Sequence, residues 1–413
     1  MATPVRAHRR IAAAMLAATT LTLSACASGG SSESGSSEPI KLGLIASVGT
    51  RVDFGDVVSA AETAANGVNV RGGINGRNVE IVFCNENLDP NQGRTCARDL
   101  AGQDILAMAG SAVTTAEADV QTVMASAGIA NVGPWAQSGI GASEPNNYLL
   151  TGGHEWNNAA SVRCAVSEAG PRLALAVQDH PSNVPLQPLY TNGTKELGGE
   201  LVANVPIPPN AGDLAPQVTQ LIQSNPDAVT VQAAASLSTT VANQLQQLGY
   251  DGKWVIPDAT FADKDLDALG PALNTAIFTG PFPPLSAAAQ FKGLQQFEAD
   301  VAAARTAGID NLPSTRHVRA QALNAYLAVI AASEIARSAN ATDAESFKAA
   351  IESAKDIDLG GVVPPWTPSE SVSAVRQHVG SGGMYCYHWE NGTSVLDTPQ
   401  PLDVTPLIDN NLK

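Results

Sequence analysis

The alternation of short apolar runs with helical stretches is the feature that most limits how this chain can fold. Its first units are an apolar run at residues 40–45, an Ala- and Val-rich helical stretch at 54–70 and a second apolar run at 79–83. Strands that alternate with helices in this way form parallel sheets covered by helices on both faces. The same rhythm continues to about residue 150. Its further predicted elements are helices at 90–101 and 115–127 and strands at 105–109 and 129–132.

A second series of the same kind begins near residue 157. The predicted helices lie at 157–168, 186–197, 214–224 and 239–248, and the predicted strands at 172–177, 200–205, 228–232 and 254–257. The 413 residues suffice for about two domains of ordinary size. Two separate sets of strands and helices therefore predict an α/β fold with two doubly wound, Rossmann-like lobes.

Two Pro- and Gly-rich breaks interrupt the rest of the chain. The first, at 281–284, precedes two long Ala-rich helices predicted at 287–307 and 316–338. The second, at 360–365, precedes a C-terminal β pattern at 384–396 that turns at Asn391-Gly392. The breaks indicate points where the chain leaves one structural unit for another.

The N-terminus has the pattern of an export signal. Basic residues up to Arg10 precede an apolar run at 11–23, which is shorter than the ~20 residues that span a membrane. The run ends in Leu23-Ser24-Ala25-Cys26, the pattern of the bacterial lipoprotein box. We expect residues 1–25 to be removed and the Cys26 thiol to carry the lipid, although a cysteine buried in an ordinary helix is the alternative.

The residues after Cys26 fit a membrane tether. Residues 26–38 are rich in Gly and Ser and are typical of a flexible linker. With two or more acyl chains, the protein would be anchored stably. We expect it at the outer face of the cytoplasmic membrane, in contact with the membrane only through its lipid anchor.

The charge balance excludes one class of partner. Lys and Arg number 23 against 39 Asp and Glu, and the formal net charge is −16. A chain this acidic repels the phosphates of nucleic acids. We expect no nucleic-acid partner.

The cysteine count fits an oxidising compartment. Besides Cys26 the chain has Cys84, Cys96, Cys164 and Cys386, which predict two disulfides in any of three pairings. No C-x-x-C or H-E-x-x-H motif occurs, and the six His are scattered. We expect no metal and no cofactor.

Motifs of catalysis are also missing from the sequence. The segment after the leader has no G-x-S-x-G elbow, no P-loop and no G-x-G-x-x-G. We therefore expect a binding protein and not an enzyme.

One motif resembles a known family. Gly72-Gly73-Ile74-Asn75-Gly76-Arg77 follows a predicted helix and precedes a predicted strand, and it resembles the Leu/Ile/Val-type solute-binding proteins of ABC importers. The glycines would end the helix in left-handed geometry, and Asn75-Gly76 would turn the chain into the strand. Further matches, which extend the resemblance from about residue 40 to the C-terminus, are Asp89-Pro90, Gly110, Ala127-Gly128-Ile129, Gly133-Pro134 and Ile256-Pro257-Asp258.

The resemblance implies a type 1 periplasmic binding protein fold. Two lobes would be joined by a three-segment hinge, with the ligand in the cleft between them. The implied lobes are residues 39–151 with 281–359, and residues 152–280 with 360–413. A monomer of this kind would capture a small molecule, foremost an amino acid or an analogue, and deliver it to the membrane subunits of an ABC permease. The alternatives are a ligand-sensing surface receptor, and a binder of a non-amino-acid carboxylate or an uncharged solute.

The lobe division favours one disulfide pairing. Cys84 and Cys96 fall in the first lobe, while Cys164 and Cys386 fall in the second. The pairing Cys84–Cys96 and Cys164–Cys386 leaves the hinge free, whereas either alternative would join the lobes covalently.

The resemblance implies that three first-lobe segments line the cleft. Phe54 stands where the family often has an aromatic residue, although it could instead be a hydrophobic staple on the following helix. Residues 110–115 correspond to the carboxylate-binding loop, with Ser111, Thr114 and Thr115 as candidates. Thr114 and Glu117 also form a capping-box pattern, so Thr114 could cap a helix.

The third segment is residues 133–138. It corresponds to a loop that supplies backbone amides and a hydroxyl in the family, here from Ala136 and Ser138. Trp135 would add a flat apolar wall, or would pack under the loop.

The second lobe would hold the other end of the ligand. Its candidates are Glu155 and Trp156, residues 179–185, Ser236 in the small-residue loop 233–236, and Asp258. Asp258 matches the acidic residue with which the family holds an ammonium group, although it could instead cap a turn. The chain departs from amino-acid binders of the family at residues 180–183 and 233–236.

Overall fold

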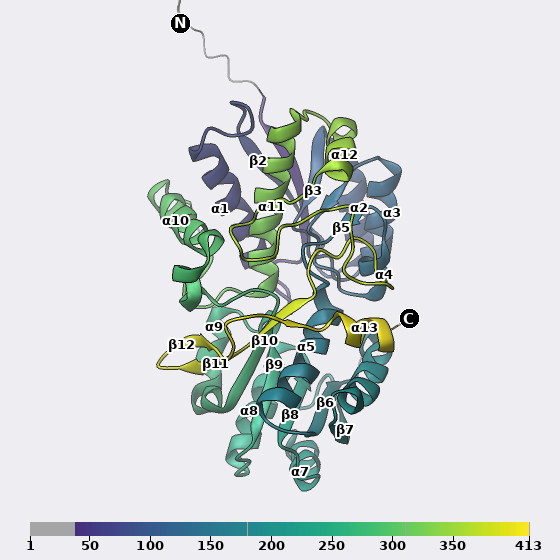
Figure 1. Cartoon of the computed structure of the whole chain (residues 1–413), viewed down its shortest axis with the longest axis vertical. Coiled ribbons are helices and arrows are strands. Elements are labelled where there is room, and N and C mark those ends of the chain that lie inside the picture. The colour runs from purple at the N-terminus through teal and green to yellow at the C-terminus, as the bar shows by residue number, and fades with distance from the viewer. Residues whose placement is uncertain (1–37, 180, 310, 413) are drawn as a thin grey trace, which may run out of the picture. The chain divides into compact units, whose positions relative to one another are not determined.

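Two sheets organise the computed structural model, which describes residues 38–179, 181–309 and 311–412. These residues belong to one compact unit that contains two lobes (Figure 1). The predictions of the leader at 1–25, of lipidation at Cys26 and of most of the tether fall on residues 1–37, outside the described ones. No described helix is long and apolar enough to cross a membrane.

The first lobe is built on a five-stranded parallel sheet in the order β2-β1-β3-β4-β5. Its strands are β1 (Ile40–Ala46), β2 (Val79–Asn85), β3 (Ile105–Ala109), β4 (Asn131–Val132) and β5 (Asn147–Tyr148). β1 and β3 are almost entirely buried, as expected for strands covered on both faces. The parallel sheet predicted before residue 150 is confirmed.

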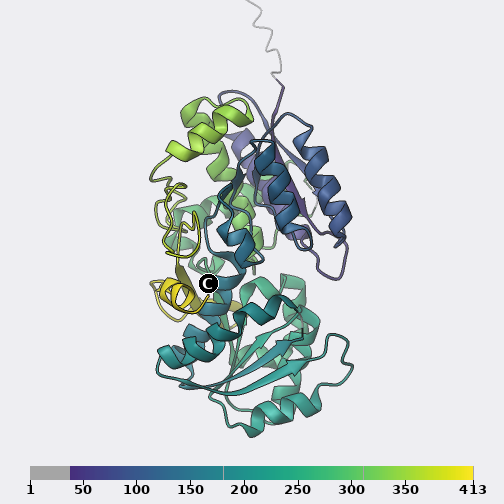
Figure 2. The ribbon, with the colours of Figure 1, turned by 90° about the vertical axis from the view of Figure 1, so that its right-hand side faces the viewer.

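Helices cover both faces of this sheet. One face packs against α1 (Gly55–Val70), α10 (Lys292–Thr306), α11 (Ala320–Ala339) and α12 (Ala344–Ser353). The other face packs against α2 (Pro90–Ala101) and α3 (Glu117–Ser126), and α4 (Gly139–Ser143) follows β4. Figure 2 shows the blue helices α2 and α3 and the green helices α11 and α12 on opposite sides of the purple strands. Segments from both halves of the chain therefore share one core.

The diagnostic glycine motif has the predicted conformation. α1 ends at Val70, and Gly72, Gly73, Asn75 and Gly76 all have positive φ. A Cβ at Gly73 would lie 2.1 Å from the backbone oxygen of Arg77, so only glycine fits there. The motif ends the helix and turns the chain into β2.

The second lobe is built on an eight-stranded mixed sheet with the main order β12-β11-β10-β9-β8-β6-β7. The strands are β6 (Arg172–Gln178), β7 (Glu200–Ile207), β8 (Ala228–Gln232), β9 (Lys253–Pro257), β10 (Ala276–Gly280), β11 (Gly383–Glu390), β12 (Thr393–Leu396) and β13 (Leu402–Asp403). β6 to β10 are parallel to their neighbours, whereas β11 runs antiparallel to β10. The last part of the chain thus returns to this sheet.

Helices also cover both faces of the second sheet. α5 (Gly153–Glu168) and α13 (Thr405–Asn411) pack on one face, and α7 (Ala215–Gln223) and α8 (Ala235–Gln247) on the other. α6 (Thr194–Glu196) precedes β7, and α9 (Asp263–Leu266) follows β9. Residues of β11 alternate between the two faces, with Met384 and Cys386 on one and Tyr385 and Tyr387 on the other. The prediction of two doubly wound α/β lobes is confirmed, while the residues at which the lobes divide stay a prediction.

Several element predictions were wrong in detail. The helix predicted at 186–197 is a 3₁₀ segment (Pro181–Leu186), a π-helical turn (Leu189–Gly193) and the short α6. The helix predicted at 287–307 breaks at Phe291, which has extended backbone angles between a 3₁₀ segment and α10. β10, α12 and α13 were not predicted, because short apolar stretches do not reveal their partners.

Both predicted disulfides are confirmed. Cys84 of β2 bonds to Cys96 of α2, and Cys164 of α5 bonds to Cys386 of β11. Each bond joins a helix to the sheet on which that helix packs. Neither bond crosses from one lobe to the other.

The two disulfides should differ in their contribution to stability. They close loops of 12 and 222 residues. Chain-entropy arguments give about 3 kcal/mol for the short loop and about 5 kcal/mol for the long one. We expect the double substitution Cys164→Ala with Cys386→Ala to lower the free energy of unfolding more than Cys84→Ala with Cys96→Ala. Urea denaturation without reductant measures the difference, and a larger loss from the Cys84–Cys96 pair would contradict it.

Candidate ligand-binding cleft

A cleft of about 790 Å³ has walls from both lobes. Its loops follow β1, β3 and β4 in the first lobe and β6, β8 and β9 in the second, so it lies at the carboxyl ends of parallel strands. The first lobe contributes Thr50, Arg51, Val52, Asp53, Phe54, Thr114, Trp135, Gln137, Arg319 and Gln321. The second contributes His154, Asn157, Gln178, Asn183, Gln232, Ala233, Ala234, Ala235, Ser236, Thr239, Pro257, Ala259, Thr260, Ala262, Lys264, Asp265 and Ala268.

Two aromatic side chains form the apolar part of the first-lobe wall. Phe54 immediately precedes α1, and Trp135 follows β4; both line the cleft and both belong to the core of the lobe. The guanidinium of Arg319 lies 5.2 Å from the centre of the Phe54 ring. Both aromatic residues therefore serve the core and the cleft at once.

Neutral polar side chains dominate the second-lobe wall. His154 and Asn157 lie in the first turn of α5, while Gln178 and Gln232 end β6 and β8. His154 Nε2 lies 3.4 Å from Gln232 Nε2, and the Ala234 amide donates to Gln178 Oε1 at 2.9 Å. Burial lowers the pKa of His154 to about 4, so its imidazole is neutral at pH 7.

Three side chains in the cleft wall carry buried polar atoms without a hydrogen-bond partner among the described residues. They are Thr114 through Oγ1, Asn157 through both Oδ1 and Nδ2, and Gln321 through Oε1. Buried polar groups are almost always hydrogen-bonded, and leaving one unpaired costs about 1–3 kcal/mol. The described residues therefore leave the hydrogen-bonding capacity of these atoms unused.

The structure brings four of the predicted site residues into the cleft wall: Phe54, Thr114, Trp135 and Ser236. It places the others outside it. Ser111 is buried and its hydroxyl accepts from the Ile45 amide, and Ala136 is buried with its carbonyl accepting from the His154 amide. The loop predicted at 179–185 contributes Asn183, while residue 180 lies outside the described residues.

Thr115 and Ser138 bond to the protein's own carboxylates. Thr115 Oγ1 donates to Glu86 Oε2 at 3.3 Å, and Glu86 Oε1 accepts from the Thr114 amide at 2.6 Å. Ser138 Oγ donates to Glu117 Oε2 at 2.6 Å. The predicted capping box is wrong, because α3 starts at Glu117 and the Thr114 hydroxyl caps nothing.

Glu155 and Trp156 point away from the cleft. Glu155 is buried and forms a bidentate ion pair with Arg376, with N–O distances of 2.8 and 3.0 Å. Trp156 is fully buried in the core of the second lobe. Both residues thus serve the interior of the protein.

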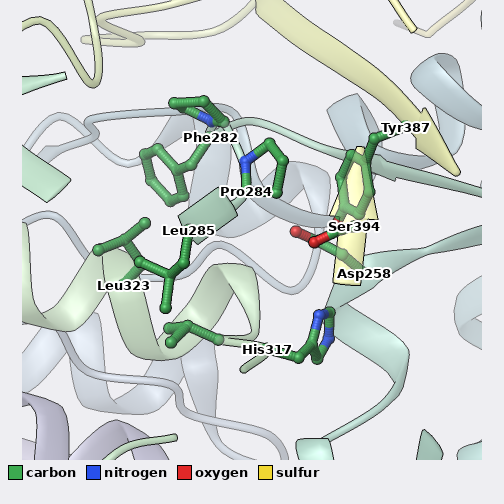
Figure 3. A pocket seen from close by; sticks show the side chains of 10 residues that line it. Asp258, Phe282, Pro284, Leu285, His317, Leu323, Tyr387 and Ser394 are labelled. Carbon is green, nitrogen blue, oxygen red and sulfur yellow. The ribbon is translucent and has the colours of Figure 1, made fainter. Parts of the chain in front are cut away.

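Asp258 lies behind the cleft wall in a separate cavity of about 10 Å³ (Figure 3). The cavity also holds Tyr387, His317 and Ser394, and Figure 3 shows their side chains around the carboxyl group. Asp258 is 3% exposed and starts a 3₁₀ turn (Asp258–Thr260). Desolvation raises the pKa of Asp258 to about 7, against the lowering effect of the Tyr387 hydroxyl and the Ala259 amide.

Comparisons with known proteins identify the fold and the family. A family model described as periplasmic binding protein matches residues 39–393. The chain belongs to this family. The Leu/Ile/Val-binding protein BraC3 of Rhizobium johnstonii is 26% identical over 331 residues, which cover 77% of this chain and 84% of that protein.

Solved structures share the type 1 fold of this periplasmic binding protein. A fatty acid ABC transporter substrate-binding protein from Thermomonospora curvata has a TM-score of 0.72 at 17% identity, covering 91% of this chain and 95% of that one. A leucine-binding protein from Thermotoga maritima has a TM-score of 0.69 at 16% identity, covering 87% and 98%. At these identities the likeness shows the fold alone.

Sequence reasoning missed most of the polar wall of this periplasmic binding protein. α5 begins at Gly153, four residues before its predicted start, so residues 154–157 form a helical turn. His154 and Asn157 lie three positions apart and share one face, while Glu155 and Trp156 point to the interior. Gln178 and Gln232 could have been found, because each is the last residue of a strand at the cleft edge.

Ion pairs near the mouth of the cleft connect the two lobes. Lys264 Nζ of the second lobe lies 3.3 Å from Asp53 Oδ2 of the first. Arg316, which precedes α11, pairs with Asp263 at 2.5 Å and with Asp267 at 3.0 Å. These side chains are partly exposed, so each pair contributes at most about 1 kcal/mol. Such weak links between the lobes are compatible with opening and closing.

The Glu155–Arg376 pair should be essential to the stability of the second lobe. Removing one partner of a buried ion pair leaves an uncompensated buried charge and costs about 3–5 kcal/mol. We expect Glu155→Ala to lower the free energy of unfolding by that amount in urea denaturation. Asp119→Ala is the matched control, because Asp119 pairs with Arg94 at 2.8 Å on the surface and should cost no more than about 1 kcal/mol. Equal losses in the two variants would contradict the assignment.

The buried Asp258 should make stability depend on pH in a defined direction. Its pKa of about 7 in the folded protein exceeds the ordinary value of 3.8, so the folded state retains a proton that the unfolded state releases between those values. The free energy of unfolding of the wild type, relative to Asp258→Asn, should therefore be greatest below about pH 4 and fall as the pH rises to about 7.

The expected fall is on the order of a few kcal/mol, at about 1.4 kcal/mol for each unit of pKa difference. Urea denaturation of both proteins from pH 4 to pH 8 measures it, and the other titrating groups are the same in both. A difference that does not change with pH would show that the Asp258 carboxyl is not held protonated.

Proposed function

We propose that this periplasmic binding protein captures a small-molecule solute in the interlobe cleft, outside the cytoplasm, and delivers it to the membrane subunits of an ABC permease. The observation that carries the proposal is the cleft of about 790 Å³ with walls from both lobes. A molecule that contacts both walls stabilises the closed arrangement of the lobes, because it binds that arrangement better than the open one.

The arrangement of the chain supports this function. The chain passes three times between the two sheets, between β5 and β6, between β10 and α10, and between α12 and β11. Each disulfide stays within its own lobe, and the ion pairs between the lobes are partly exposed. A permease can recognise the closed lobes and receive the solute when they open.

The remaining parts of the proposal come from the sequence. The lipoprotein box at Cys26 supports a lipid anchor at the outer face of the cytoplasmic membrane, and the proposed protein acts there as a monomer. The relatives leave the ligand class open, since one is named for Leu, Ile and Val and another is described as a fatty acid binder. Catalysis has no support in the sequence motifs.

Native mass spectrometry of the full chain, incubated with an extract of cellular small molecules, tests capture. We expect one bound small molecule per chain, together with a smaller radius of gyration in X-ray scattering because the lobes close. Uptake of that solute should fall when the gene is deleted and should recover when it is restored. If the protein binds the solute while uptake persists, delivery is wrong and a sensing role is favoured.

A further inference from the structure

Most of the groups predicted to bind a zwitterionic ligand are bonded to other groups of the protein. An α-amino acid needs donors for its carboxylate and an acidic side chain for its ammonium group. In the first lobe the donors occur at residues 114–115 and 137–138, and in the second lobe the acids are Glu155 and Asp258. Each of the side-chain groups named below, except the Thr114 hydroxyl, has an internal partner or is shielded from the cleft.

Glu86 holds the first pair of donors. It is fully buried, and it accepts hydrogen bonds from the Thr114 amide at 2.6 Å, the Thr115 hydroxyl at 3.3 Å and the Ser47 hydroxyl at 3.0 Å. The Thr114 amide and the Thr115 hydroxyl therefore bind Glu86, whereas the Thr114 hydroxyl has no partner among the described residues.

Glu117 binds the second pair of donors, the Gln137 amide and the Ser138 hydroxyl. Its Oε1 accepts from the Gln137 amide at 2.9 Å, and its Oε2 accepts from the Ser138 hydroxyl at 2.6 Å. A ligand carboxylate would have to displace Glu86 and Glu117 from these donors. Desolvation raises the pKa of Glu117 to about 7, so near pH 7 Glu117 occupies the donors while carrying only part of a negative charge.

The two acids predicted to hold an ammonium group are also missing from the cleft wall. Glu155 is held by Arg376, and Asp258 lies in its own cavity behind Pro257 and Ala259. The acids that do line the cleft are Asp53 and Asp265, and both accept hydrogen bonds from the protein. Asp53 accepts from the Gly55 amide and from Lys264, and Asp265 accepts from the Ala262 amide.

The basic residues of the cleft are largely engaged as well. Arg319 pairs with Asp56, and Lys264 pairs with Asp53. Arg51 is exposed, so water and salt screen its attraction for an anion. The charges of the cleft are thus balanced within the protein or screened by solvent.

Neutral polar groups and flat apolar surfaces remain for the ligand. Three side-chain groups have no partner among the described residues: the hydroxyl of Thr114, the carboxamide of Asn157 and the carboxamide oxygen of Gln321. They line the same cleft as the uncharged His154 and the rings of Phe54 and Trp135, on walls from both lobes. A hydroxyl and an amide donate and accept, while aromatic faces favour apolar or planar surfaces.

Resting on the proposed function, we infer that the cleft takes an uncharged organic solute that combines an apolar face with hydroxyl or amide groups, and not an amino acid or a carboxylate. Asn157 is the residue that determines this specificity, because it lines the cleft and both the donor and the acceptor of its buried side-chain amide have no partner among the described residues. An uncharged ligand does not compete for the donors that Glu86 and Glu117 already occupy.

The same native mass spectrometry identifies the chemical class of the bound molecule. Calorimetric titration of the full chain then compares L-leucine, octanoate, and a panel of hexoses, cyclic polyols, nucleosides and primary amides. We expect an uncharged molecule in the extract experiment and binding within the uncharged panel, without binding of L-leucine or octanoate. If no molecule binds in either experiment, the proposed function fails. If an amino acid or a carboxylate binds, the proposed function stands and the inference is overturned.

Paired variants test which residues make the contacts. With the bound uncharged solute, Thr114→Val and Asn157→Leu should each weaken binding at least tenfold, because each removes a hydrogen-bonding group from the wall. Thr115→Val is the matched control for Thr114→Val. Asp258→Asn tests whether the Asp258 carboxyl binds the ligand. Both variants should bind the solute with an affinity within about twofold of that of the wild type. Thermal unfolding of the unliganded variants verifies folding. A loss confined to Asp258→Asn, with Asn157→Leu unchanged, would overturn the inference.

Discussion

Hydrogen bonds to buried carboxylates determine how the loops around the cleft fold. Glu86, Glu117 and Glu155 all sit close to the cleft, and each is bound by donors of the protein itself. Without those donors, each carboxylate would carry a desolvation penalty of several kcal/mol. Because the loops at the strand ends fold around these carboxylates, the same contacts that stabilise the loops also determine which groups remain for a ligand.

The contacts within each lobe are stronger than the contacts between the two lobes. Within a lobe, Asp300 of α10 accepts from Arg71 at the end of α1 and from Tyr326 of α11, which ties three helices together. Between the lobes, His317 contacts the Phe261 carbonyl oxygen and Gln321 donates to that of Ala259, while the ion pairs lie near the surface. Strong internal bonds with weak links between the lobes allow each lobe to move as one body.

The sequence predicted the parts of the fold that local patterns control. Strand and helix alternation predicted both sheets, and the glycine motif at 72–76 predicted a left-handed helix end. The disulfides followed from which lobe each cysteine belongs to. β10 and α13 were missed, because they are only five and seven residues long and so short an apolar stretch does not reveal its partners. These elements depend on tertiary packing, which a short stretch of sequence does not reveal.

The candidate site was less predictable, for a reason visible in α5. Whether position 155 or position 157 faces the cleft depends on where the helix begins and on how it is rotated about its axis. Four residues of error in the start changed the interpretation of a whole turn, since residues three apart share a face and adjacent ones do not. Arg376, more than two hundred residues away, then fixes the rotation by pairing with Glu155 on the inner side. With Glu155 paired on the inner side, Asn157 of the same helical turn lines the cleft, and no sequence pattern near α5 reveals this arrangement.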